Sequence, residues 1–117
     1  MREAIRDKSR LVHMLGAIDN VHKYSAGMNR KELETNTMAF HAIVYNIQII
    51  GEAAYMLTKE FKLSHTEVEW RLIEGMRHVI VHDYYQVSVN EVWVVIQKDL
   101  QPLRQQIEAY LTQMENE

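Results

Sequence analysis

Apolar residues recur at helical spacing along almost the whole chain, and this periodicity constrains the fold more than any other feature of the sequence. Strict alternation between apolar and polar side chains, as in a half-buried strand, is confined to a few short stretches such as Glu67–Leu72. The longest repeat advances by 3.5 residues on average and comprises Phe40, Ile43, Ile47, Ile50, Ala54, Leu57 and Phe61. The periodicity therefore predicts an all-α fold.

The first two expected helices lie in the N-terminal half of the chain. One runs from about Glu3 to Lys23. Asn29 followed three residues later by Glu32 is an N-cap signal, because the side chains of such a pair bond each other's free backbone N–H groups. Together, this cap and the apolar repeat that follows it predict one long second helix, from roughly Arg30 to Lys59.

Two further helices are expected to begin at capping boxes of the pattern S-x-x-E. Ser64 predicts a third helix from near His65, and Ser88 predicts a fourth from near Val89. Pro102 is expected to bend the fourth helix, because proline removes a backbone donor. Four helices joined by short loops form an antiparallel four-helix bundle.

Length and composition indicate one domain that spans residues 1–117. A chain of this size buries roughly two-thirds of the surface that it exposes when unfolded, which is enough for a core without disulfides or a structural metal. The sequence contains no internal repeat, low-complexity tract or linker. No second domain is therefore expected.

The distribution of charged residues limits the cellular compartment and the binding partners that we expect for this protein. The segment MREAIRDKSR carries charges where a signal peptide needs apolar residues, and the chain has no cysteine, so we expect a cytoplasmic protein. The longest uncharged stretch, between Glu34 and Glu52, includes polar residues and falls short of the ~20 apolar residues of a membrane span. The net charge of -3 argues against nonspecific coating of nucleic acid. Neither a membrane nor DNA is an expected partner.

The densest cluster of polar and aromatic groups is GMRHVIVHDYYQ, Gly75–Gln86, where the third helix is expected to end. His78 and His82 are four residues apart and share a helix face, as two metal ligands would. Arg77 and His82 are five apart, so on a regular helix they diverge by ~140° and rise by ~7.5 Å. They converge on one phosphate only if the helix ends near His82 or a second subunit completes the site. This geometry favours a site formed by a dimer.

An arginine and a histidine without an evident metal set suit the cleavage of an RNA phosphodiester. Histidine moves protons to or from the 2′-hydroxyl near neutral pH, while a guanidinium binds the charge that develops on the phosphorane. Tyr84 and Tyr85 can stack a base or donate a hydrogen bond. The repeated Glu-x-x-His pairs of a di-iron bundle are absent from the sequence, and no metal or other cofactor is expected.

Three segments resemble the HepT-like branch of the HEPN superfamily. They are IIGEAA at Ile49–Ala54, WRLIEGMRHVIVHDYYQV at Trp70–Val87 and VWVVIQKDLQPL at Val92–Leu103. The family motif R-x-x-x-x-H-x-Y stands here as Arg77, His82 and Tyr84. His78 departs from the pattern, since an Asn is common beside the arginine in relatives.

The resemblance implies a homodimeric helical bundle that is the toxin of a toxin-antitoxin pair. It implies a metal-independent endoribonuclease with a composite site in which Arg77 and His82 come from both subunits. The implied partner is a minimal nucleotidyltransferase antitoxin, which in the family is associated with transfer of AMP to the tyrosine of the motif, here Tyr84. His78, Asp83 and Tyr85 are supporting candidates.

Other interpretations of the same residues stay open. Glu52 is either an exposed residue or an anchor for Arg77, and the helix-weakening Gly51 indicates a close backbone approach by the third helix or a second subunit. Arg77 alone would usually pair with Glu74 or Asp83. The alternative function is a non-catalytic binding module that docks the nucleotidyltransferase through the surface around Arg77.

Overall fold

The computed structural model describes the backbone of residues 2–82 and 88–116 and the side chains of residues 6–77 and 88–116. The elements follow in the order α1 (Arg2–Ser25), α2 (Arg30–Thr35), α3 (Thr37–Met56), α4 (Lys59–Ser64), α5 (Trp70–His82), α6 (Val89–Val94), the π-helical segment η2 (Val95–Asp99) and α7 (Leu100–Glu115). No strand occurs in these two ranges, so the predicted all-α class is confirmed.

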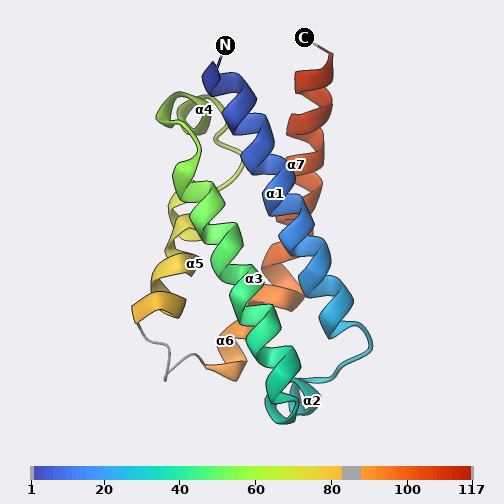
Figure 1. Ribbon diagram of the computed structural model, residues 1–117. Helices are drawn as coiled ribbons and strands as arrows, with labels where there is room; N and C mark the ends of the chain where they lie inside the picture. Colours follow the sequence, from blue (N-terminus) through green and yellow to red (C-terminus); the bar gives the residue numbers. More distant parts are fainter. Residues whose placement is uncertain (1, 83–87, 117) are drawn as a thin grey trace.

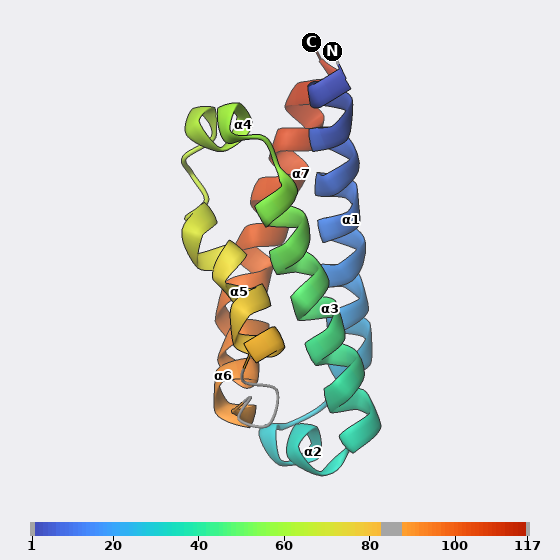
Figure 2. The same cartoon turned by 60° about the vertical axis from the view of Figure 1, so that its left-hand side comes forward.

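The long helices form the predicted antiparallel four-helix bundle (Figure 1). α1, α3, α5 and the continuous unit α6–η2–α7 run alternately in opposite directions, and the two chain ends lie at the same end of the bundle. α3 packs against both α1 and α5, and α1 also packs against α7 (Figure 2). No helix within the described ranges is long and apolar enough to cross a membrane.

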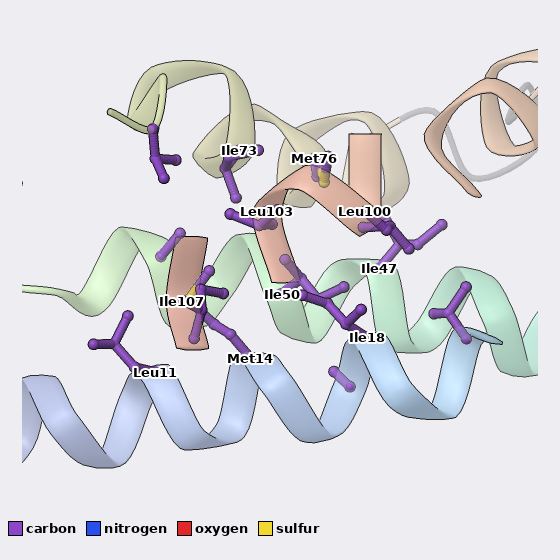
Figure 3. Close-up of a cluster of buried hydrophobic side chains, with 14 of the residues drawn as sticks. Leu11, Met14, Ile18, Ile47, Ile50, Ile73, Met76, Leu100, Leu103 and Ile107 are labelled. Carbon is purple, nitrogen blue, oxygen red and sulfur yellow. The ribbon is translucent and has the colours of Figure 1, made fainter. Parts of the chain in front are cut away.

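The core lies where these helices face each other (Figure 3). The apolar repeat predicted from the sequence supplies its central part: Ile43, Ile47, Ile50, Ala54, Leu57 and Phe61 are all buried, whereas Phe40 at the start of the repeat is only partly covered. α1 and α7 contribute the opposing side chains, among them Leu11, Met14, Ile18, Leu103 and Ile107. The repeat thus predicts the buried side of α3 correctly.

The prediction of one unbroken helix over Arg30–Lys59 is wrong at two places. α2 ends at Thr35, and Asn36 leaves helical geometry so that its side chain can accept a hydrogen bond from the backbone N–H of Ala39 at 3.1 Å. A polar side chain that bonds a nearby backbone N–H group competes with a continuous helix in this way. The second break is at Leu57, which is extended with ψ 146.

Asp7 on α1 holds the second break in place. The backbone N–H and the hydroxyl of Thr58 donate to its two carboxylate oxygens at 2.8 and 2.7 Å. The Thr58 hydroxyl in turn accepts from the N–H of Phe61 and caps α4. Asp7 is only 4% exposed, so a buried carboxylate from the first helix fixes the turn between α3 and α4.

The third helix begins at Trp70 and not near His65 as predicted. The Ser64 hydroxyl donates back to the carbonyls of Glu60 and Phe61, so this serine ends α4 instead of starting a new helix. Glu67, the other half of the expected capping box, accepts a hydrogen bond from the Tyr110 hydroxyl at 2.8 Å. That bond lowers the pKa of the Glu67 carboxyl, while burial raises the pKa of Tyr110.

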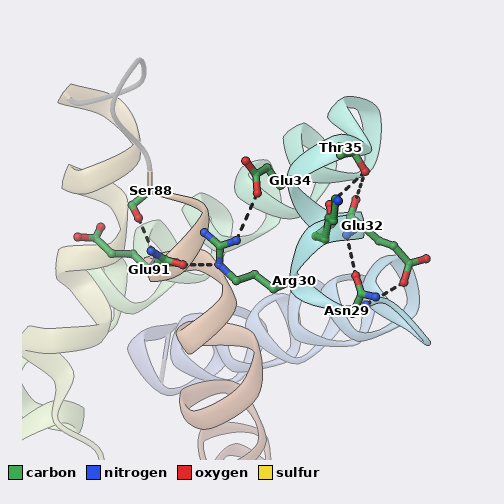
Figure 4. Close-up of polar contacts among 9 residues, drawn as sticks. Asn29, Arg30, Glu32, Glu34, Thr35, Ser88 and Glu91 are labelled. Atoms are coloured by element: carbon green, nitrogen blue, oxygen red, sulfur yellow. Dashed lines mark hydrogen bonds and ion pairs between the residues drawn. The ribbon is translucent and has the colours of Figure 1, made fainter.

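The other two predicted helix starts are confirmed (Figure 4). Asn29 and Glu32 form a complete capping box, with the Asn29 side chain accepting from Glu32 N–H at 2.8 Å. Ser88 caps α6 through Glu91 N–H. Arg30 also donates to Asn90, which ties α2 to the first turn of α6.

The fourth helix of the bundle departs from α-helical geometry in the π-helical segment η2, directly before the turn that contains Pro102, while the bend expected at Pro102 itself stays a prediction. The N–H of Leu100 donates to the carbonyl of Val95, five residues earlier. The inner stripe nevertheless continues unbroken through Ile96, Leu100 and Leu103, all of which are buried.

We expect Asp7→Ala to lower the free energy of unfolding by ~1–3 kcal/mol, because the two Thr58 donors lose their buried acceptor. Urea denaturation measures this change. Asp19→Ala is the matched control: Asp19 also lies on α1 and pairs with the distant Arg104, but its side chain is 50% exposed. Its loss should cost under ~1 kcal/mol, and equal costs for the two variants would contradict the assignment.

Candidate functional site

Arg77 occupies a point of direct backbone contact between α3 and α5. A Cβ atom built on Gly51 would lie 2.6 Å from the backbone nitrogen of Arg77 and 3.2 Å from the carbonyl oxygen of Ile73. Real Cβ atoms do not approach other atoms so closely, so only glycine fits at position 51. The predicted close approach at Gly51 is confirmed, and it is the third helix of the bundle that makes it.

The neighbouring residue on α3, Glu52, pairs with the guanidinium. Its Oε2 lies 3.4 Å from Nη1 of Arg77. The Arg77 side chain is 22% exposed and that of Glu52 56%. Both open interpretations of Glu52 therefore hold: it is exposed, and it contacts Arg77. An ion pair this long and this exposed contributes under ~1 kcal/mol.

Tyr55 completes the support of the arginine and was missed by the sequence analysis. The guanidinium carbon of Arg77 lies 3.5 Å from the centre of the Tyr55 ring, a cation–π contact. Tyr55 follows Gly51 by four residues on the same helix, so its ring lies one turn further along α3. The i, i+4 spacing from a glycine already suspected of a close approach was the available signal.

Glu74 does not pair with Arg77, although it lies one turn earlier on α5. It accepts instead from Nζ of Lys62 at 3.2 Å, and both side chains are largely covered. The same ammonium donates to the carbonyls of Ala54 and Tyr55 at 3.2 and 3.3 Å, in the last turn of α3, where the Ala54 carbonyl also accepts from the N–H of Leu57. Lys62 thus joins α3, α4 and α5 beside Tyr55.

The guanidinium of Arg77 keeps unused hydrogen-bonding capacity. Its Nε is buried and has no partner among the described residues. Arginine carries five N–H donors in a planar fork that matches two oxygens of a phosphate. Among its nitrogens, Nη1 donates to the carboxylate of Glu52 at 3.4 Å. Arg77 is therefore fixed by its backbone and its ring contact more than by its hydrogen bonds.

The second predicted catalytic residue, His82, is the last residue of α5. Within the helix, its backbone position is ~140° around the axis from that of Arg77 and ~7.5 Å further along. The side chains of His78 and His82 lie outside the described residues, as do Asp83, Tyr84 and Tyr85 entirely.

In the parts of the chain that the structure describes, no three His, Asp or Glu side chains gather as a metal site would require. The described part of the candidate site is therefore the Arg77 guanidinium stacked on the ring of Tyr55, where α5 contacts α3. Such a group can bind a phosphate and stabilise negative charge on it. Of the described side chains, Glu52 and Tyr55 contact Arg77, and neither is the histidine that the sequence predicts for proton transfer.

Comparisons with known proteins give one consistent result. A family model described as "Ribonuclease HepT-like" matches residues 14–110. A protein of Caldanaerobacter subterraneus subsp. tengcongensis, provisionally named as an RNase, is 31% identical over 101 residues, 86% of this chain and 90% of the relative. "Probable ribonuclease HepT" of Thermococcus cleftensis is 26% identical over 101 residues, 86% of this chain and 92% of the relative. No solved structure gives a significant match.

We expect Gly51→Ala to lower the free energy of unfolding, since the added methyl group forces α3 and α5 apart at Arg77. Overpacking of this kind costs ~1–3 kcal/mol. Gly16→Ala on α1 is the control, because a Cβ there meets no atom within 4 Å. Replacing that helical glycine should stabilise the protein by up to ~1 kcal/mol. A Gly51→Ala variant that is as stable as Gly16→Ala would refute the close contact.

Proposed function

We propose that this chain, because it belongs to the ribonuclease HepT-like family, cleaves RNA with Arg77 and His82 as its catalytic pair. The observation that carries this proposal is the setting of Arg77, which is placed on Gly51 and stacked on Tyr55, with Nη1 in a long contact with the exposed Glu52 that a phosphate can replace. Residues 1–117 form a single domain, as the match over residues 14–110 supports.

The reaction needs no metal, because RNA supplies its own nucleophile. His82 takes the proton of the 2′-hydroxyl as the 2′-oxygen attacks the neighbouring phosphorus, or returns a proton to the 5′-oxygen as the P–O5′ bond breaks. Arg77 binds the phosphate oxygens on which negative charge develops. The weak, exposed contact with Glu52 favours this role, since the carboxylate can give way to a phosphate at little cost.

The active form is a homodimer in which each site takes Arg77 from one copy and His82 from the other. The two residues diverge along α5, so a second copy is the simplest way to bring an arginine and a histidine to one phosphate. His78, Asp83 and Tyr85 are supporting candidates at the same end of α5. Glu52 holds Arg77 in the free enzyme.

In its cellular role the protein is a cytoplasmic toxin, and its antitoxin is a minimal nucleotidyltransferase. This partner neutralises the toxin by transferring AMP to Tyr84, two residues after His82. The attached AMP would place an anionic phosphate close to the catalytic pair and compete with RNA for the guanidinium of Arg77. Tyr84 is thus the regulatory residue of the proposed site.

We expect His82→Ala to cleave RNA ~10²- to 10⁴-fold more slowly than the wild type, because it lacks the group that moves protons. The assay uses mixed-sequence RNA oligonucleotides with EDTA present throughout, and DNA of the same sequence as a substrate that lacks the 2′-hydroxyl. His13→Ala, at an exposed position on α1, should retain full activity.

Full activity of a folded His82→Ala variant, or cleavage that EDTA abolishes, would contradict this mechanism. A folded wild type that cleaves no RNA but binds a nucleotidyltransferase through the surface around Arg77 would identify the chain as a non-catalytic docking module.

The second expectation concerns Tyr84→Phe, which keeps the ring but removes the acceptor oxygen. This variant should cleave RNA like the wild type and resist neutralisation by the nucleotidyltransferase. Intact mass after incubation with that partner and ATP measures the modification directly. An adenylyl group that still appears on Tyr84→Phe would show that another residue is the acceptor.

A further inference from the structure

A groove lies between the start of α5 and the unit formed by η2 and α7, and its volume is about 360 Å³. We call it the α5–α7 groove. Its floor consists of the buried side chains of Val68, Ile73 and Leu103, while Leu72 and Pro102 are exposed on opposite walls. In Figure 3, Ile73 of α5 and Leu103 of α7 lie close to each other. The groove is therefore apolar along its length.

The rim of the α5–α7 groove is acidic. Glu67, Glu69 and Asp99 line it, against a single lysine, Lys98. Glu67 accepts a hydrogen bond from the hydroxyl of Tyr110. The ion pairs within the described ranges all use other carboxylates, so Glu69 and Asp99 have no cationic partner among those residues. Carboxylates beside an apolar surface are complementary to the basic groups of a binding partner.

One wall of the groove is helically irregular. Lys98 and Asp99 belong to the π-helical segment η2, and Pro102 follows in the first turn of α7. Such π turns are rare within helices and are frequently found at functional sites. On the opposite wall, Gly75 follows Leu72 by about one turn of α5, and a Cβ atom there would meet no atom within 4 Å. The irregular segment thus lies where the surface of the bundle is open.

We infer that the α5–α7 groove binds an amphipathic helix of the nucleotidyltransferase partner, with apolar side chains on the groove floor and lysine or arginine at the rim. This inference rests on the proposed function, which supplies the partner. A groove between two helices accepts a third helix, whose apolar residues at i, i+3 and i+4 reach the floor. Its basic residues then pair with Glu69 and Asp99.

Docking in the groove leaves the surface around Arg77 free. Leu72 and Arg77 are five residues apart on α5, so they lie ~140° apart around the helix axis. His82 ends α5 ~15 Å further along the axis than Leu72. Because a small domain is ~30 Å across, a transferase held in the groove spans the distance to the end of α5. The proposed acceptor, Tyr84, follows two residues later in the chain.

RNA and a second copy of the chain fit the groove less well than a basic helix. The three carboxylates of the rim repel a phosphate backbone. A twofold pair of copies places the same patch on both sides of the interface, so the acidic rims would oppose each other. A partner with basic residues is the occupant that both the charge and the apolar floor favour.

The docking site is tested by calorimetric titration of this chain with the purified nucleotidyltransferase. We expect the double variant Glu69→Arg/Asp99→Arg to bind at least ~10-fold more weakly than the wild type, because like charges then oppose each other at the rim. Glu115→Arg is the matched control, since it reverses an exposed carboxylate of α7 outside the groove. This control should bind like the wild type.

Single cysteines locate the contact without adding a charge, and the chain has no cysteine of its own. Leu72 on the groove wall is 61% exposed, and Leu63 on α4, outside the groove, is 69% exposed. We expect the bound nucleotidyltransferase to suppress maleimide labelling of Leu72→Cys and to leave labelling of Leu63→Cys unchanged. Intact mass measures the labelled fraction of each variant.

Wild-type affinity of the double variant, or labelling of Leu72→Cys that the partner does not slow, would overturn the inference. Protection of Leu72→Cys by an RNA oligonucleotide alone would assign the groove to RNA. Protection that rises with the concentration of this chain alone would assign it to a second copy. Either result would reject the nucleotidyltransferase as the occupant.

Failure of the docking inference and failure of the proposed ribonuclease are read from different assays. A wild type that binds no nucleotidyltransferase would overturn this inference together with the partner assignment. RNA cleavage is measured without the partner, so it would be unaffected by that result. A chain that binds the partner through the groove but cleaves no RNA would support the docking site and reject the ribonuclease.

Discussion

The contact between Gly51 and the backbone of Arg77 sets the distance between α3 and α5, and the candidate site depends on that distance. Because glycine has no side chain at the crossing, the backbone of Arg77 on α5 lies directly against α3. Its side chain then reaches Glu52 and the ring of Tyr55, which follow Gly51 within one turn. A larger residue at position 51 would move the arginine away from both.

The contacts that hold the guanidinium are individually weak, and this suits a group that has to bind and release a substrate. The Glu52 pair is long and exposed, and a cation–π contact at such a site contributes only ~0.5–1 kcal/mol. The backbone crossing provides the rigidity instead. The position of Arg77 is therefore set by the fold, while its Nη1 contact with Glu52 is weak enough to give way to a phosphate, as the proposed function requires.

The sequence predicted those parts of the fold that depend on local rules. The buried seam of α3, the caps at Asn29 and Ser88 and the close approach at Gly51 each follow from a short pattern of residues. The break at Leu57 was missed because the apolar repeat runs through it, and the break at Asn36 was missed because the helix start predicted at the Asn29 cap was joined directly to that repeat. The second break also depends on Asp7, fifty-one residues before Thr58, which no local pattern reveals. Tyr55 was missed for a similar reason, since its role comes from the crossing of two helices.

The central claim is that Arg77 and His82 act on one phosphate from two copies of the chain, and subunit mixing tests it most directly. Arg77→Ala and His82→Ala variants are each inactive on their own, and they are refolded together in equal amounts. In a composite arrangement half of the dimers are mixed, and each mixed dimer has one intact site of two, so about a quarter of the wild-type RNA cleavage should return. A mixture that stays as inactive as its components would contradict the account.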